Sequence, residues 1–250
     1  NISDPVLASI SSALKTLKFL TSLKLNFEFC QNFTNQGLNS LSSGLKALSQ
    51  LRKLKVILPW SSEITDQGLA NFAAVFKSLP LLSTLSLDFW EHVNDKGVEH
   101  LTDGLKALPL LSKLKLKFTS GCKLTDLGIG HISSLLGILS NLNTLKLKFN
   151  PDLITDSGIE TLFSALKVHS KINNLHLDSL SGYLIKKREI KSFSEALKAL
   201  PLKTLNLELF GNTIFLEEKI KCVASCFEFL KSLKSFRLEY LTHLQSRITS

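Results

Sequence analysis

The chain has no methionine, only two tryptophans and two tyrosines, and only four cysteines among its 250 residues. None of the cysteines forms a C-x-x-C pair, and four in a chain of this length are too few for a disulfide scaffold. We therefore interpret them as reduced structural thiols, which favours an intracellular, cytoplasmic location. The sequence begins at Asn1 without a methionine, so we expect further chain upstream.

Long hydrophobic runs are also missing. Lys, Ser or Asp interrupts every apolar stretch within a few residues, so none reaches the roughly 20 residues that a bilayer-spanning helix needs. We therefore expect no membrane insertion. Arginine is scarce, at 4 residues against 26 lysines. Because proteins that read nucleic acids rely on arginine for bidentate contacts, the net charge of +9 argues only weakly for a nucleic-acid partner.

What the chain does have is a repeat. The pattern L-x-x-L-x-L-x-F occurs at Leu82–Phe89, Leu111–Phe118 and Leu142–Phe149, and looser versions occur on both sides. The middle apolar residue recurs every 29 to 31 residues, at Leu23, Leu54, Leu85, Leu114, Leu145, Leu175, Leu205 and Phe236. A fixed period of this size predicts a solenoid, in which stacked units bury the apolar faces that one unit cannot bury alone.

Each period reads as a helix followed by a strand. Apolar residues three and four positions apart precede every strand, as in Leu69, Phe72, Phe76 and Leu79, which is the stripe of an amphipathic helix. Leu85, Leu87 and Phe89 then alternate with polar residues, as in a strand with one buried face. Similar stripes predict helices before all eight strands, including Leu7-Ile10-Leu14-Leu17 at the start and Ile220-Val223-Phe227-Leu230 near the end. Since helices need about 10 Å each and strands about 4.8 Å, we expect an arc with the sheet on its concave side.

A short opener starts five of the helices. It reads Thr34-Asn35-Gln36-Gly37, Thr65-Asp66-Gln67-Gly68, Asn94-Asp95-Lys96-Gly97, Thr125-Asp126-Leu127-Gly128 and Thr155-Asp156-Ser157-Gly158. The threonine hydroxyl can cap the helix, and the carboxylate suits the positive end of the helix dipole. The glycine indicates close packing at the first turn. The opener is lost in the last two units, where Glu189 and Lys219 take the glycine position.

These residues resemble the leucine-rich repeat family, and the long helix-containing unit is similar to its ribonuclease-inhibitor-like subclass. The resemblance implies an α/β horseshoe of about eight repeats with a parallel concave sheet and convex helices, and a single domain over residues 1–250 that is part of a longer chain. The family's strand asparagine falls at Glu28, Trp90, Thr119 and Asn150, so only one of these positions keeps it. Phe27, Phe89, Phe118 and Phe149 instead predict an aromatic stack behind the sheet.

No catalytic or metal-binding arrangement emerges from the sequence, so we expect no enzyme, metal or cofactor. Asp66, Asp95, Asp126 and Asp156 suggest calcium, but carboxylates about 10 Å apart cannot share an ion that needs six to eight close oxygens. His100 and His131 occupy equivalent positions without a third ligand. Cys122 lies beside Lys123 but has no evident base. No H-E-x-x-H, G-x-S-x-G or P-loop pattern occurs.

The outward side chains of the strands are the candidate binding residues. In the first five units eight lysines face one acid, Asp88, whereas the last three units carry three acids and one arginine. Such a graded face is either a solvated surface or a groove that steers an acidic partner. Trp60 and Trp90 follow two adjacent strands and are candidate rim anchors. The candidate partner-binding residues are Lys24, Lys53, Lys55, Lys113, Lys115, Lys117, Lys146, Lys148, Asp178, Glu208, Arg237 and Glu239.

The hypothesis that follows is a non-enzymatic interaction scaffold or adaptor that binds another protein with an acidic surface on its concave face, within a larger assembly. The T-D-x-G openers also resemble those of F-box-type substrate receptors, which makes the arm of a ubiquitin ligase the second hypothesis. The third is that the lysines bind an acidic surface such as RNA or tubulin, which strong salt dependence would reveal. A role in regulating a GTPase is known among similar repeat proteins, but no residue here indicates it.

Overall fold

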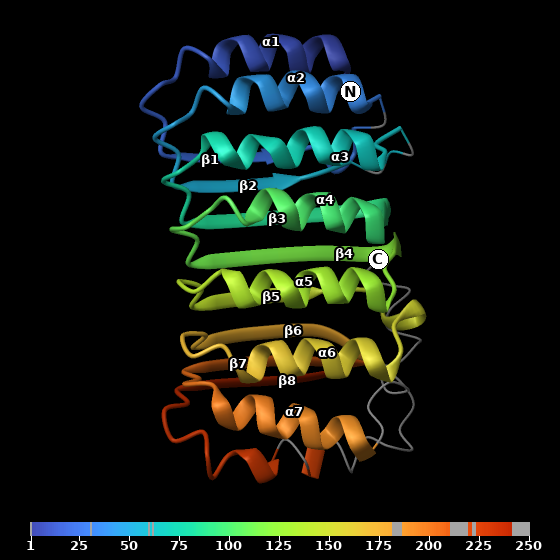
Figure 1. Cartoon of the computed structure of the whole chain (residues 1–250). Coiled ribbons are helices and arrows are strands. Elements are labelled where there is room, and N and C mark those ends of the chain that lie inside the picture. The colour runs from blue at the N-terminus through green and yellow to red at the C-terminus, as the bar shows by residue number, and fades with distance from the viewer. Residues whose placement is uncertain are drawn as a thin grey trace.

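The computed structural model describes residues 2–30, 32–59, 61, 63–181, 187–210, 220–221 and 224–241, and of residues 90–92, 120, 151, 179–181, 187–190, 209–210 and 240–241 it describes the backbone alone. Helices and strands alternate along the chain (Figure 1). The helices are α1 (Asp4–Leu14), α2 (Asn35–Leu45), α3 (Asp66–Ala73), α4 (Asp95–Leu105), α5 (Asp126–Ile138), α6 (Asp156–Lys167) and α7 (Lys187–Ala199). The strands are β1 (Ser22–Asn26), β2 (Lys53–Ile57), β3 (Thr84–Asn94), β4 (Lys113–Lys123), β5 (Thr144–Lys148), β6 (Asn174–Ser181), β7 (Thr204–Phe210) and β8 (Ser235–Leu241).

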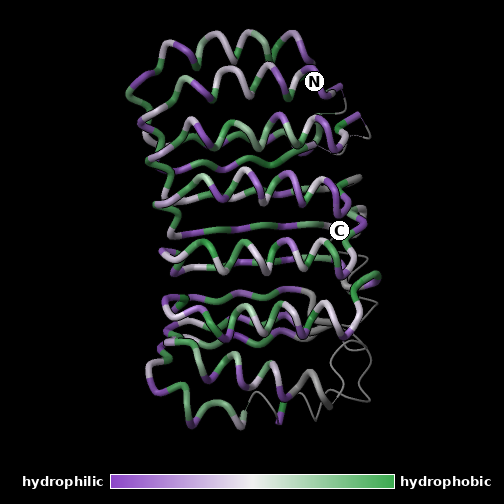
Figure 2. The backbone as a smooth tube through the Cα atoms, in the orientation of Figure 1, coloured by the Kyte–Doolittle hydropathy of each residue, from purple (hydrophilic) through white to green (hydrophobic). Residues whose placement is uncertain are grey.

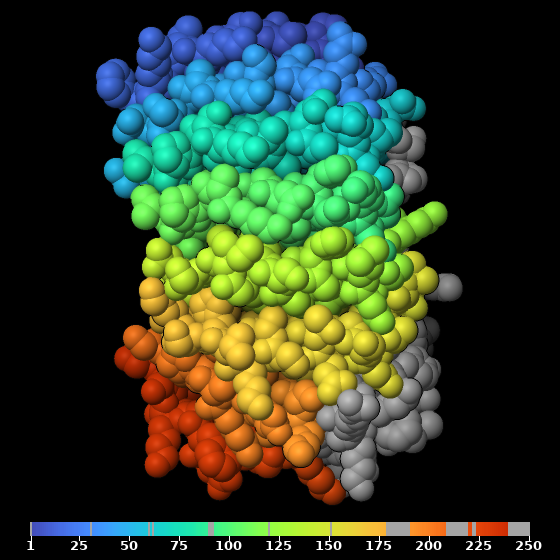
Figure 3. All heavy atoms as spheres, in the orientation of Figure 1, coloured from blue at the N-terminus to red at the C-terminus, as the bar shows by residue number. Residues whose placement is uncertain are grey.

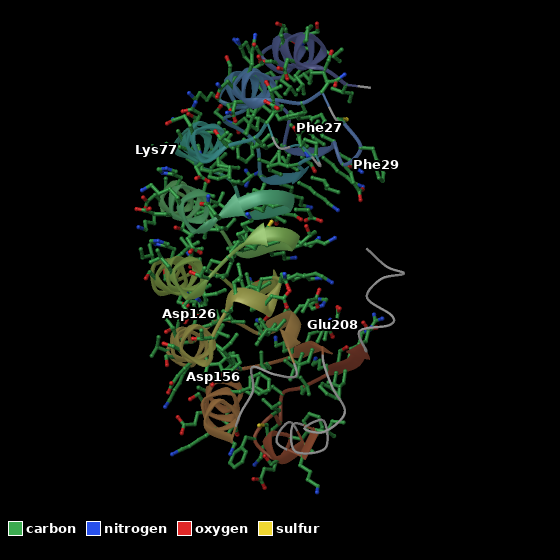
Figure 4. The ribbon with its side chains drawn as sticks, turned by 90° about the vertical axis from the view of Figure 1, so that its right-hand side faces the viewer. Phe27, Phe29, Lys77, Asp126, Asp156 and Glu208 are labelled. Atoms are coloured by element: carbon green, nitrogen blue, oxygen red, sulfur yellow. The ribbon has the colours of Figure 1, made fainter. Side chains whose placement is uncertain are left out.

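The strands form one parallel sheet in sequence order, β1 to β8. The register confirms the repeat unit, because Leu23 pairs with Leu54, Leu54 with Leu85, and so on to Leu205 with Phe236. Helices cover one face of the sheet (Figure 1), successive units form stacked layers (Figure 3), and the sheet lies on the inner side of a gentle arc (Figure 4). The predicted horseshoe with a concave sheet is confirmed.

A continuous apolar core lies between the helices and the sheet. The strand residues that alternate inward and the helix stripes are nearly all buried, and Figure 2 shows the resulting alternation of hydropathy along the tube. Phe27, Phe89, Phe118 and Phe149 are each at most 2% exposed. The rings of Phe89 and Phe118 stack in parallel with centroids 5.1 Å apart, as predicted, whereas Phe27 packs at a tilt against Phe33.

The openers connect successive units, which is more than helix capping. Asp95 at the start of α4 accepts hydrogen bonds from Thr125 of the next unit, through its backbone N–H (2.8 Å) and its hydroxyl (2.6 Å), and from the N–H of Gly128 (2.9 Å). Asp4 receives the same two bonds from Thr34. Asp126 likewise receives both from Thr155. Asp95 and Asp126, predicted only to favour the helix dipole, therefore belong to a ladder of hydrogen bonds between units. Figure 4 labels Asp126 and Asp156 at the starts of two successive helices.

The glycines of the openers make room for this ladder. A Cβ on Gly128 would lie 2.5 Å from Asp95 Oδ1, and one on Gly158 would lie 2.3 Å from Asp126 Oδ1. Both distances are far below van der Waals contact, so no other residue fits without displacing the carboxylate. The predicted close packing at the first helical turn is confirmed, and the group being packed is the aspartate of the preceding unit.

The structure corrects three local predictions. The third helix changes to a 3-10 helix over Ala74–Ser78 instead of remaining α-helical to Leu79. Leu17, expected in the first buried stripe, lies beyond α1 and is 48% exposed. β3 and β4 do not end at their phenylalanines but run on, with register shifts after Phe89. Among the described residues, no helix has the length and apolarity needed to cross a bilayer.

Candidate functional site

The concave face presents three rows of side chains, set by the first, third and fifth positions of the shared register. The first row, across β1 to β8, is Ser22, Lys53, Thr84, Lys113, Thr144, Asn174, Thr204 and Ser235. The middle row is Lys24, Lys55, Ser86, Lys115, Lys146, His176, Asn206 and Arg237. The last row is Asn26, Ile57, Asp88, Lys117, Lys148 and Asp178, and beyond a register shift Glu208 pairs with Glu239.

Within these three rows, all the carboxylates stand in the last row. The first and middle rows contain only lysine, arginine, histidine and uncharged polar residues. The sign of the charge therefore changes in two directions. It changes along the solenoid, as the sequence predicted, and it also changes along each strand, from the basic first and middle rows to the acid-containing last row. Figure 4 shows Glu208 on this side of the sheet and Lys77 on the opposite, helical side.

Five lysines of the candidate site extend into open surroundings in the first two rows. Lys24, Lys53, Lys113 and Lys146 are exposed and Lys55 is half-buried. Of these five ammonium groups, none lies within ion-pair distance of a carboxylate in the described part of the chain. We call these residues the lysine track. It spans β1 to β5, with Thr84 and Ser86 of β3 in its middle.

Lys115 differs from its neighbours, and this corrects the expectation that it points freely to solvent. Its ammonium group lies 2.9 and 3.0 Å from the two carboxylate oxygens of Asp88, whose residue is only 5% exposed. A carboxylate this well buried requires a nearby cation. Lys115 therefore neutralises a group of its own chain, and it is a poor position for testing contacts with a partner.

The remaining carboxylates of the face also have partners within the chain. Lys148 reaches across β6 to Glu208 Oε1 at 3.4 Å. Arg237 Nε donates to Glu239 Oε1 at 2.7 Å. His176 Nε2 lies 2.5 Å from Asp178 Oδ1, and among the described residues this oxygen accepts no hydrogen bond. We treat it as a close polar contact.

A shallow hollow of about 130 Å³ lies among these paired groups at β6, β7 and β8. Its walls are the residues just described together with Asn206 and Leu207, so its lining is His176, Asp178, Asn206, Leu207, Glu208, Arg237 and Glu239. The hollow is small and partly open. It gives the C-terminal part of the concave face a shallow recess.

The pKa shifts of two residues on this face, Glu208 and Lys117, disfavour their charged forms. Burial raises the pKa of Glu208, and the neighbouring carboxylate of Asp178 raises it further, against the attraction of Lys148. Burial lowers the pKa of Lys117, and repulsion from Lys148 and Lys115 adds to this effect, whereas Asp88 opposes it. An anion bound near Lys117 would relieve part of that repulsion.

The other sequence candidates do not form a site. Cys122 is 4% exposed, and its sulfur faces the carbonyl of Phe89 at 3.8 Å, so it is a packed thiol. Cys30, Cys122 and Cys226 form no disulfide bond among the described residues, and Cys222 lies outside them. In the described parts of the chain, no three or more His, Cys, Asp or Glu side chains, His100 and His131 included, are grouped to hold a metal ion. Trp60 and the side chain of Trp90 lie outside the described residues.

The sequence missed the ion pairs and the rows. Counting outward residues strand by strand gave the correct positions but not which charges meet, because Lys148 and Glu208 are 60 residues apart. A row-by-row alignment of the repeats would have shown that carboxylates occur only at the fifth position. It would not have shown that Asp88 is buried.

Comparisons with known proteins place the architecture. No protein-family model and no curated protein matches the chain. Among solved structures, leiomodin-1 actin-binding site 2 has a TM-score of 0.48 at 17% identity over 63% of this chain and 85% of that one. The tropomodulin C-terminal domain of Caenorhabditis elegans has 0.41 at 11% identity, over 77% and 92%. Rad7, in the yeast complex of Rad7 and Elc1, has 0.52 at 16% identity, over 96% and 64%.

At these identities the likeness concerns the fold alone. The Rad7 alignment extends over nearly the whole chain. It agrees with the single parallel sheet and the helix–strand unit of 29 to 31 residues described above. The chain has a leucine-rich-repeat fold.

Proposed function

We propose that this chain is a non-enzymatic interaction module that binds another protein, one with an acidic surface, on the concave face of its sheet. The observation that carries the proposal is the concave face itself, where nine lysine and arginine side chains oppose four carboxylates. Lysines crowded on neighbouring strands repel one another, and an anionic partner relieves this repulsion. The packed state of Cys122 gives no support to nucleophilic chemistry.

The finer classification is also proposed. The unit of 29 to 31 residues with full α-helices on the convex side supports the ribonuclease-inhibitor-like type of repeat. Three described cysteines that form no disulfide bond support an intracellular, cytoplasmic location.

Partner capture from native extract tests the proposed function. The wild-type protein is compared with a variant that carries Lys113→Glu and Lys146→Glu, two exposed concave positions, by affinity capture and mass spectrometry. A matched control carries Lys46→Glu and Lys77→Glu, which make the same charge change on the convex side. We expect the concave variant alone to lose the captured proteins and circular dichroism to show all three folded. Equal capture by the two variants would refute binding on the concave face.

A further inference from the structure

The carboxylates of the concave face are already occupied by cations or polar groups of the same chain. Asp88 is held by Lys115, Glu208 by Lys148 and Glu239 by Arg237, and Asp178 touches His176. Three of these acids, Asp178, Glu208 and Glu239, are among the residues that we expected from the sequence to bind a partner. A carboxylate that is buried and paired within its own chain offers little to a partner, because binding would first have to break that contact.

Within the part of the chain that the structure describes, the ammonium groups of the lysine track form no ion pair with a carboxylate. The five members of the track, Lys24, Lys53, Lys55, Lys113 and Lys146, stand in the first two rows, where no carboxylate occurs. They lie on four strands from β1 to β5. With strands about 4.8 Å apart, the track is about 19 Å long and runs perpendicular to the strands.

We propose that the partner binds through an acidic polypeptide segment that crosses β1 to β5 along the lysine track, and that Asp88 and Glu208 act as internal counter-ions that reduce the cationic surface instead of contacting the partner. The inference rests on the proposed function and specifies the chemistry and direction of its ligand. An extended chain advances about 3.3 Å per residue, so about six residues span the track. Carboxylates suit ammonium groups as point charges, which do not require the flat, bidentate geometry that arginine provides.

A peptide probe of known sequence tests the charge and the length. Fluorescein-labelled hexaglutamate and triglutamate are titrated with the folded protein by fluorescence anisotropy at about 50 mM salt, where the charges are little screened. We expect hexaglutamate to bind at least tenfold more tightly than triglutamate. Lys113→Gln with Lys146→Gln should weaken hexaglutamate binding at least tenfold, whereas the convex control Lys46→Gln with Lys77→Gln should change it less than threefold.

The counter-ion role is tested by a variant that should strengthen peptide binding, whereas the lysine variants should weaken it. Asp88→Asn keeps the shape of the side chain and releases the ammonium group of Lys115 beside the track. We therefore expect it to strengthen hexaglutamate binding at least threefold. A partner-contacting role for the acid predicts no gain. Weaker binding by Asp88→Asn, with circular dichroism showing a folded protein, would overturn the counter-ion role.

The remaining outcomes separate this inference from the proposed function. Equal weakening by the concave and convex variants, or no binding of hexaglutamate, would overturn the acidic-segment inference. Tighter binding of an oligothymidylate of the same charge would overturn it in favour of a phosphate polyanion. The capture experiment decides the proposed function independently. If capture still depends on Lys113 and Lys146, concave-face binding stands even where the segment inference fails.

Discussion

Two glycines in one helix should respond to alanine in opposite ways. Gly128 and Gly130 are both in the first half of α5, and alanine favours a helix over glycine by about 1 kcal/mol at an ordinary position. A Cβ on Gly130 would meet no atom within 4 Å. Gly130→Ala should therefore stabilise the protein by about 0.5–1 kcal/mol.

Alanine at Gly128 would instead place its Cβ against the hydrogen-bond ladder between the units. Its Cβ would lie 2.5 Å from Asp95 Oδ1, the atom that accepts hydrogen bonds from the backbone N–H groups of Thr125 and Gly128. Each hydrogen bond to a charged group contributes about 1.5–3 kcal/mol. Displacing the carboxylate of Asp95 weakens both of these hydrogen bonds. The gain in helix propensity of about 1 kcal/mol offsets only part of the stability that is lost. We expect Gly128→Ala to destabilise the protein by about 2 kcal/mol or more.

Urea unfolding followed by circular dichroism measures both effects, and a double-mutant cycle assigns the cause. In an Asp95→Ala background the clash is gone, so Gly128→Ala should become neutral or slightly stabilising. Two outcomes would refute the reasoning. Gly128→Ala and Gly130→Ala could change the free energy of unfolding with the same sign, or the cost of Gly128→Ala could persist without Asp95.

Three further predictions concern the core, the ladder and the concave face. Phe118→Ala should cost about 3–5 kcal/mol in denaturant melts, and Lys117→Ala less than about 0.5 kcal/mol; equal costs would mean that the two side chains do not point to opposite faces. Asn35→Asp should stabilise by about 0.5–1 kcal/mol in the same assay, because the hydroxyl of Thr65, which now accepts from the Asn35 amide, could donate to a carboxylate and accept from its own helix; a loss of stability would contradict this. The raised pKa of Glu208 contributes stability that is present below its unfolded pKa and is lost as the pH rises through the folded pKa. The free energy of unfolding of Glu208→Gln should therefore increase relative to that of the wild type as the pH rises above about 4.5, and a pH-independent difference would count against this.

The sequence predicted the fold well because the periodicity is strong in each unit. Leu54, Leu85 and Leu114 pair in the predicted register, and Phe89 and Phe118 stack behind the sheet. Those features depend on the two-residue period of a strand and the spacing of one repeat, both of which are visible in the sequence. Failures occurred where a unit departs from regularity, as where α3 becomes a 3-10 helix.

The candidate site was only half predictable. Which side chains face outward follows from the alternation along each strand, and Lys113 and Lys146 are exposed as expected. Whether an outward charge is free depends on its neighbours on other strands and on its depth. Asp88 is 5% exposed although it faces outward, and this burial is what holds Lys115. No alternation pattern contains that information.

The ladder carries a rule that links the openers to the concave face. An aspartate or asparagine of one opener bonds the threonine or asparagine that begins the next opener, and the glycine of that next opener leaves room for the side-chain oxygen of the preceding unit. The first helix begins with the related segment Ser3-Asp4-Pro5-Val6, in which Asp4 accepts hydrogen bonds from Thr34 in the same way. The ladder holds each unit at a fixed position relative to the next, which is also what aligns the outward residues into rows. A track of lysines from four different strands therefore exists only while the openers keep the units in register, and ladder variants such as Gly128→Ala are expected to weaken binding of hexaglutamate without touching a lysine.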